Sequence, residues 1–209
     1  GFMMLEFEKI VTFPFKFTIP SLAQQFIENN SIYSYRLKFI KRFLYLILKN
    51  QKHLEITKIL PKHQRILWIN ISAPSLGDTL MDLSSREMLR GRKVDLFTDK
   101  NNAELFINDF LFEKVFTEIN QVDELKYDLV IVDSYSTRSI KVKNNIVYKT
   151  PYVGMFGFYN GPEVNRVLFS FHQMNNLLGY VKSFDEINKL AKTSISISKE
   201  DQEIIEDLK

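Results

Sequence analysis

Residues 65–85 read RILWINISAPSLGDTLMDLSS and decide the fold of this chain. The short apolar run at 66–69 predicts a strand over residues 66–71 that is covered on both faces, as strands of parallel sheets are. The small residues at 72–75 end that strand, and the pattern that follows predicts a helix over 79–90. A strand, a loop and a helix in this order are typical of the first unit of an open α/β fold.

The same alternation of strand and helix continues along the chain. A segment that crosses between elements holds Lys141 and Lys143, and Gly179 is suited to end a long helix. The further strands are expected at 93–98, 114–116, 128–133 and 145–149, and the further helices near 101–108 and over 162–178. This spacing favours the α/β class, with a Rossmann-like, doubly wound parallel sheet.

Three parts of the chain differ in composition and pattern. Residues 1–62 are expected to form an N-terminal extension that contains a basic amphipathic helix over 31–50. Residues 63–197 are expected to form the Rossmann-like domain. Ser198 is suited to cap a helix or linker over 198–209, because Glu200 and Asp201 would lie in its first turn.

The composition excludes several kinds of site. The chain has no cysteine, and its three histidines lie far apart without the spacing of metal ligands, so neither a disulfide nor a zinc site is expected. Neither a GxGxxG motif nor a P-loop is present, which argues against a standard dinucleotide or P-loop nucleotide site. We therefore expect no bound cofactor.

The start of the chain has no basic segment followed by an apolar one, as a signal peptide would have. No apolar run approaches the roughly 18 residues that a membrane-spanning helix needs. A cytoplasmic location is therefore expected.

Positive charge is concentrated in one segment. Nine Lys or Arg and one acid, Glu55, lie between Arg36 and Arg65, although the net charge of the whole chain is only +3. Because the helix over 31–50 combines these cations with aromatic residues, Lys38, Lys41 and Arg42 are candidate contacts to an anionic membrane surface. The alternative is a helix packed on its own domain with solvated lysines. Nucleic-acid binding is not expected, because no recognised binding module accompanies the basic segment.

Asp78 is the candidate catalytic residue. It lies on the first turn of a predicted helix at the carboxyl edge of a parallel sheet, where open α/β folds keep their chemistry. A carboxylate there can act as a general base that accepts a proton from a reacting hydroxyl. The alternative is structural, because an acid at the start of a helix is stabilised by the helix dipole and the free backbone N–H groups. Asp99 and Asp133 end predicted strands at the same edge, although such acids more often cap loops.

Three stretches resemble the lipopolysaccharide heptosyltransferase family, glycosyltransferase family 9. ILWINISAPSLGDTL is similar to the family's first strand, loop and Gly-Asp helix start. YDLVIVDSYSTRS is similar to a later strand that ends in an acid, and NRVLFSFHQMNNLLG to the long helix that leads to the domain junction. The resemblance covers a little over half of the chain, from about Arg65 to Gly179.

The resemblance implies the N-terminal half of a GT-B fold. In this family, that half binds the acceptor, a lipid-linked lipopolysaccharide core, and the other half binds a nucleotide-sugar donor such as ADP-heptose. Transfer is inverting and independent of metal, and the aspartate at the position of Asp78 is the general base. The donor domain is then expected to lie outside these 209 residues, so that this part alone should not turn over.

The other candidate site residues would contact the acceptor or a phosphate group. The loop residues Ser72, Ser75 and Gly77 could offer hydroxyl or backbone groups beside a helix N-terminus, although a tight turn explains them equally well. The basic residues Arg138, Lys141 and Lys143 could bind phosphates or carboxylates of the acceptor, although exposed basic residues are usually only solvated surface.

The sequence thus predicts a glycosyltransferase domain that acts at the inner face of the cytoplasmic membrane. The alternative is a non-catalytic Rossmann-like binding module that docks on a partner or a membrane through residues 31–65.

Overall fold

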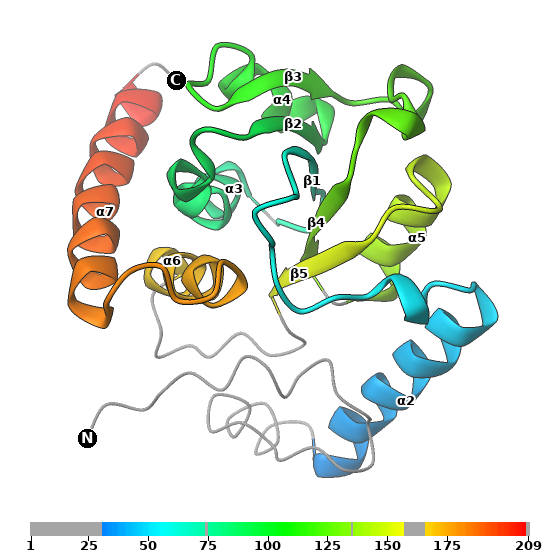
Figure 1. Cartoon of the computed structure of the whole chain (residues 1–209). Coiled ribbons are helices and arrows are strands. Elements are labelled where there is room, and N and C mark those ends of the chain that lie inside the picture. Colours follow the sequence, from blue (N-terminus) through cyan, green and yellow to red (C-terminus); the bar gives the residue numbers. More distant parts are fainter. Residues whose placement is uncertain (1–30, 74, 135, 157–165, 208–209) are drawn as a thin grey trace.

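The computed structural model describes residues 31–207, apart from 74, 135 and 157–165. Five strands form one sheet in the order β3-β2-β1-β4-β5, and every neighbouring pair is parallel. The strands are β1 (Arg65–Asn70), β2 (Lys93–Thr98), β3 (Phe112–Phe116), β4 (Leu129–Ser134) and β5 (Tyr152–Phe156). Helices cover both faces of this sheet (Figure 1). The predicted Rossmann-like α/β fold is confirmed.

The first face of the sheet carries most of the connecting helices. Side chains of alternate strand residues, such as Ile66 and Trp68, form one core with Leu83, Phe106 and Met174 from these helices. The helices are α3 (Leu76–Asp82), η4 (Ser84–Leu89), α4 (Lys100–Ala103), η5 (Glu104–Phe106) and α6 (Arg166–Leu177). A long helix, α7 (Phe184–Asp207), packs outside α6 through a separate apolar cluster.

The second face is covered by α5 (Thr137–Ile146) and by the end of α2 (Ile32–Leu48). Leu67 and Ile69 of β1 pack there with Ile140 of α5 and Leu46 of α2. Short 3-10 turns fill the remaining connections: η3 (Lys52–Leu54), η6 (Ile119–Gln121) and η7 (Glu124–Lys126). Figure 1 shows α5 on one side of the sheet and α3, α6 and α7 on the other.

The last strand of the sheet was predicted in the wrong place. Residues 145–149 form the end of α5 and the turn after it, and the strand comes at Tyr152–Phe156 instead. Ile146 and Val147 are apolar because they pack α5 on the sheet, which gives the same short apolar run as a strand. The segment with Lys141 and Lys143 is therefore a helix.

The last helix begins much earlier than predicted. Ser198 lies inside α7, which starts at Phe184. The Ser183 hydroxyl accepts a hydrogen bond from the N–H of Glu186, whose carboxylate accepts one from the N–H of Ser183. This capping box is visible in the sequence as Ser-Phe-Asp-Glu, so the true start carried a signal. The helix predicted over 162–178 corresponds to α6 over Arg166–Leu177, and residues 162–165 of the prediction lie outside the described part of the chain.

Candidate active site

The candidate site lies where β1 and β4 end, at the point where the strand order reverses direction. The chain leaves β1 toward α3 on one face of the sheet and leaves β4 toward α5 on the other. In open α/β sheets, ligands bind outside the carboxyl ends of the strands at such a point. The residues that follow β1 and β4 are therefore the candidates for a ligand site.

Asp133 joins the two loops at this point. Its carboxylate accepts hydrogen bonds from the backbone N–H groups of Ile71 and Ser72, both at 2.7 Å, and from the hydroxyl of Ser139 at 2.6 Å. Burial raises the pKa of Asp133, and these hydrogen bonds oppose the rise. Asp133 thus fixes the course of the β1–α3 loop and, through it, the position of α3.

Asp78 lies on the first turn of α3 and is half-buried. Ser75 caps the helix: its hydroxyl donates to Asp78 Oδ2 at 2.6 Å and accepts from the backbone N–H of Asp78 at 3.2 Å. No described residue donates a hydrogen bond to the other oxygen, Oδ1. A carboxylate held in this way can still receive a proton through its second oxygen.

A buried ion pair lies one turn further along α3. The Arg166 guanidinium at the start of α6 holds the Asp82 carboxylate through two bonds, of 2.7 and 2.8 Å. Burial raises the pKa of Asp82 to about 6 although Arg166 opposes that rise. Asp78 and Asp133 are close enough for the charge of Arg166 to act on them too. One guanidinium therefore lies near three carboxylates and is bonded to one of them.

The sequence analysis missed both members of this pair. Asp82 follows Asp78 by four residues, so the two carboxylates had to share a face of the helix, which was a readable signal. Arg166 had no such signal, because only the packing of α6 against α3 brings it to the site.

Two buried polar side chains end neighbouring strands at the same edge of the sheet. Asn70 ends β1 and Thr98 ends β2, and the two residues are register partners. Both are about 1% exposed. Neither the Asn70 amide nor the Thr98 hydroxyl finds a hydrogen-bond partner within the described part of the chain. Such groups are rare in proteins and often mark functional sites.

The predicted loop residues lie together at this edge. Ser72 is half-buried, with its hydroxyl 3.2 Å from that of Ser139. Ser75 is exposed as the cap of α3, and Gly77 lies inside the first turn of that helix. Arg138 and Lys141 are exposed on α5, which begins at the same edge.

Lys143 does not reach this edge. It is fully buried near the other end of α5, where its ammonium donates to Gln51 Oε1 at 2.6 Å and to the Tyr148 carbonyl at 3.0 Å. Burial lowers the pKa of Lys143 to about 7. Its contacts hold the segment after α2 against the domain, which makes Lys143 unsuited to an acceptor.

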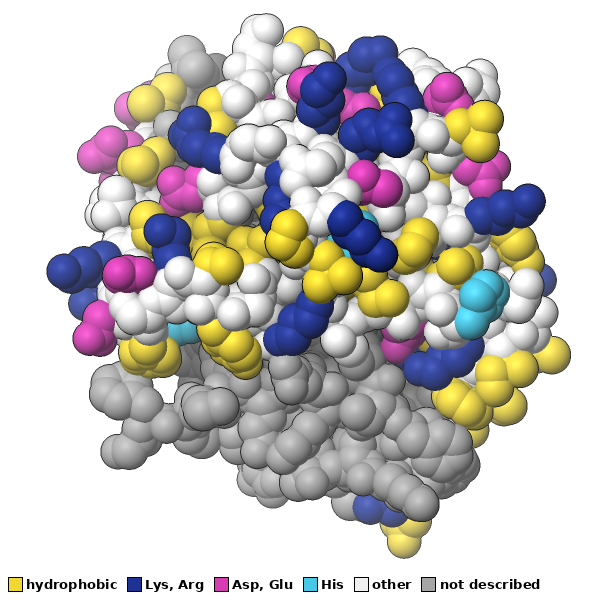
Figure 2. Space-filling model, viewed as in Figure 1, with side chains coloured by type: hydrophobic (Ala, Val, Ile, Leu, Met, Phe, Trp, Pro, Cys, Tyr) yellow, Lys and Arg dark blue, Asp and Glu magenta, His cyan; other side chains and the backbone are white. Residues whose placement is uncertain are grey.

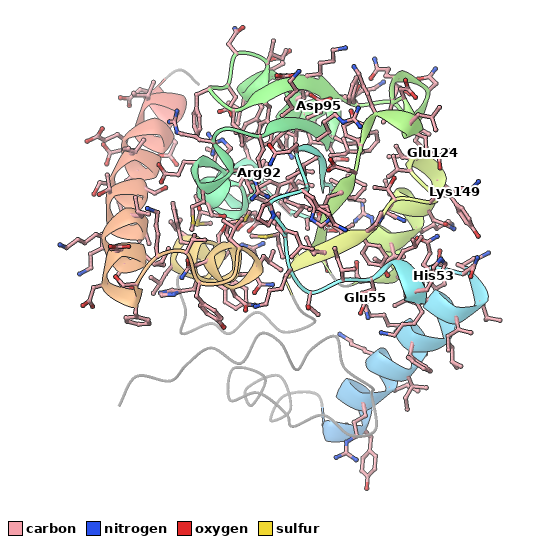
Figure 3. The ribbon with its side chains drawn as sticks, viewed as in Figure 1. His53, Glu55, Arg92, Asp95, Glu124 and Lys149 are labelled. Atoms are coloured by element: carbon pink, nitrogen blue, oxygen red, sulfur yellow. The ribbon has the colours of Figure 1, made fainter. Side chains whose placement is uncertain are left out.

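The three predicted membrane contacts of α2 differ in their exposure to solvent. Lys38 and Lys41 are exposed, but Arg42 is only 4% exposed and donates to the Glu55 carboxylate at 2.6 Å. Glu55 lies where the chain passes from α2 toward the sheet (Figure 3). Arg42 therefore faces the domain and is unsuited to a lipid surface.

A cavity of about 360 Å³ lies elsewhere, between η4 and α7. Arg86, Arg90 and Phe110 contribute to its lining from one side, and Lys189 and Thr193 from the other.

In the described residues, no three His, Asp or Glu side chains come together as a metal site would require. The described helices include none that is long and apolar enough to cross a membrane.

Comparison with known proteins gave one similar structure. The chain is similar to E. coli heptosyltransferase WaaC, solved with ADP-2-deoxy-2-fluoro heptose, at 18% identity and a TM-score of 0.38. The match covers 57% of this chain and 50% of that enzyme. No family model matches the chain, and no curated protein matches it. At this level the similarity gives no information on activity.

Proposed function

We propose that this chain contains the acceptor-binding domain of a GT-B glycosyltransferase of the heptosyltransferase kind. The observation that carries the proposal is the hydrogen bonding of the Asp78 carboxylate. The Ser75 hydroxyl donates to one of its oxygens, and the other oxygen has no donor among the described residues. The site of Asp78 at the carboxyl edge of a parallel sheet suits a general base. The resemblance of 65–85 to the first unit of that family supports the same role.

The proposed reaction is an inverting transfer that needs no metal ion and no bound cofactor. An acceptor hydroxyl attacks the anomeric carbon of a nucleotide sugar and transfers its proton to the free oxygen of Asp78. The bond from the anomeric carbon to the diphosphate breaks, and the nucleoside diphosphate leaves with that electron pair. A second domain would hold the donor. Ser75 orients the carboxylate, and Arg166 offsets the negative charge that gathers at this edge.

The proposed acceptor is a lipid-linked glycan of the lipopolysaccharide type, and the proposed location is cytoplasmic. Arg138 and Lys141 are exposed on the helix that begins at the same edge, so they are suited to phosphates or carboxylates on such an acceptor. The hydroxyls of Ser72 and Ser75 would contact the sugar. The donor would be an ADP-heptose-like nucleotide sugar.

The test is sugar transfer by the full-length protein with a panel of labelled nucleotide sugars and lipopolysaccharide core acceptors. Asp78→Asn should lower the turnover number by a factor of roughly 10² to 10⁴, the range that general bases contribute. Donor affinity and the unfolding temperature should change little. The matched control is Asp123→Asn, because Asp123 also accepts a hydrogen bond at a helix start, on η7, but far from the site. Near-normal turnover by Asp78→Asn would overturn the proposed role.

The second candidate is a non-catalytic binding module with the same fold. The reciprocal hydrogen bonds of Ser75 and Asp78 favour it, because they form a cap that would be useful in any protein. This candidate predicts that no nucleotide sugar in the panel is consumed. It also predicts that Asp78→Asn acts on stability alone.

A further inference from the structure

Helix α2 packs on the domain through Leu46, yet it exposes several other apolar side chains and buries a charged one. Leu37 and Leu44 are half exposed, and Leu48 is 82% exposed. Arg42, by contrast, is 4% exposed and paired with Glu55. A helix that only packs on its own domain would cover its apolar residues and leave its charges in water, so the exposed leucines and the buried Arg42 are not explained by that packing alone.

The exposed apolar residues lie along one face of the helix, with the exposed Lys41 between Leu37 and Leu44 on that face. Residues separated by four or seven positions lie on the same face of a helix, so Leu37, Leu44 and Leu48 lie in line. We call this set the α2 stripe; it consists of Tyr33, Leu37, Leu44, Ile47 and Leu48, all at least half exposed. In Figure 2, hydrophobic side chains gather at the lower right margin, where the C-terminal half of α2 lies. Large contiguous apolar patches usually mark an interaction surface.

The charges beside the stripe have one sign. Helix α2 contains no Asp or Glu. Arg36 and Lys41 are exposed on it, and Lys49 is exposed directly after it. Apolar side chains flanked by cations are the combination with which a helix lies in the interface of an anionic membrane. A second copy of α2 fits less well, because its cations would meet cations of the same helix.

We propose that α2 lies flat on an anionic lipid surface, with the α2 stripe inserted among the lipids and Arg36, Lys41 and Lys49 at the headgroups. The proposal does not depend on sugar transfer. Lys143 and Glu55 hold the end of α2 and the segment after it against the sheet, so the domain would follow the helix to the surface. At about 1.5 Å per residue the 17 residues of α2 reach along the surface for roughly 25 Å.

The test is co-sedimentation of the full-length protein with phospholipid vesicles. We expect binding to vesicles with about one-third phosphatidylglycerol, weak binding to pure phosphatidylcholine, and weakening by salt. The triple variant Leu37→Ser, Leu44→Ser, Leu48→Ser should lose at least about ten-fold in affinity. The matched control is Leu60→Ser, Leu105→Ser, Leu125→Ser, because these leucines are exposed elsewhere on the surface. The control should bind as the wild type does.

A second variant tests the charges independently. Each of Arg36→Gln and Lys41→Gln should lower the affinity for anionic vesicles by about five-fold. Circular dichroism checks that each variant folds, and if the triple serine variant does not, the two charge variants decide. Failure of the wild type to bind anionic vesicles would overturn the proposal, and so would equal binding by the α2-stripe variants and their controls. Stripe-dependent dimers without vesicle binding would assign the stripe to a second copy instead.

Discussion

Two buried polar clusters in this domain are built in opposite ways. At the junction with α2, the Lys143 ammonium has two acceptors, and Gln51 both accepts from Lys143 and donates to the Tyr148 carbonyl. At the carboxyl edge, Asn70 and Thr98 are as deeply buried, yet the described residues offer their side chains no partner. The two clusters lie on opposite faces of one sheet.

The difference distinguishes buried polar groups that stabilise the fold from buried polar groups whose presence the fold does not explain. A buried polar group without a partner destabilises the folded state, whereas a partnered group contributes a modest net gain. The junction cluster therefore belongs to the stability of the fold. The unpartnered Asn70 amide and Thr98 hydroxyl instead lower that stability, so the fold alone gives no reason for their presence.

The largest expected effect comes from breaking the ion pair at the carboxyl edge. Arg166→Met leaves the Asp82 carboxylate buried without its partner and should lower the free energy of unfolding by about 3 kcal/mol at pH 7. The loss should depend on pH. The pKa of Asp82 in the folded wild type, about 6, already lies above its unfolded value. The contribution of the protonated Asp82 carboxyl to the stability of the wild type is therefore lost as the pH rises through about 6.

Without Arg166, the pKa of Asp82 rises further, so the loss continues above pH 6 and the variant is more damaged at pH 8 than at pH 5. Urea unfolding at both pH values measures this difference. The double variant Asp82→Asn, Arg166→Met should recover most of the stability and show no such difference. Equal losses at pH 5 and pH 8 would show that Asp82 does not carry the buried charge.

The next effect comes from the junction cluster and has the opposite pH dependence. Gln51→Leu removes an acceptor from the buried Lys143 ammonium and should lower the free energy of unfolding by about 2 kcal/mol at pH 6. Burial has lowered the pKa of Lys143 to about 7, so at pH 9 the folded protein holds the neutral amine. The loss should then be smaller at pH 9 than at pH 6.

Chemical unfolding at pH 6 and pH 9 measures this second prediction. The matched control is Gln64→Leu, because Gln64 is exposed and its replacement should change the stability by less than about 0.5 kcal/mol. A loss that grew with pH would contradict the account of the junction cluster.

The smallest expected effect distinguishes the two clusters most sharply. Asn70→Leu replaces a buried amide that has no partner among the described residues, so the stability should stay within about 0.5 kcal/mol of the wild type or rise. The matched control is Asn175→Leu, because the Asn175 amide is also buried but bonds to the carbonyl and the N–H of Lys182. The control should lose about 2 kcal/mol in thermal unfolding. Equal losses would mean that the Asn70 amide supports the fold.

The sequence predicted the central strands well because burial on both faces leaves a distinctive pattern. β2 was predicted at its observed bounds, 93–98, and β1 within one residue. Gly179 follows α6 with a positive φ of 81°, as its position suggested. β5 was missed, because the apolar end of α5 gives the same short signal as a strand.

The sequence predicted which candidate residues lie together at the carboxyl edge only where those residues are near in sequence. Asp78, Ser72, Ser75 and Gly77 come from one loop and the first turn of one helix, so the strand–helix pattern brought them to the edge together. Arg166 joins them through packing between α3 and α6, which no local pattern contains. Lys143 was predicted as an acceptor contact but is buried, because the side of α5 that it occupies depends on how that helix packs on the sheet, which no local pattern contains.

The most direct test of the central claim is a single-turnover measurement of sugar transfer by the full-length protein with saturating donor, because it isolates the step in which the acceptor loses its proton. The account predicts that Asp78→Asn lowers that rate constant by a factor of roughly 10² or more while Asp123→Asn leaves it unchanged. An unchanged rate constant for Asp78→Asn would contradict the account.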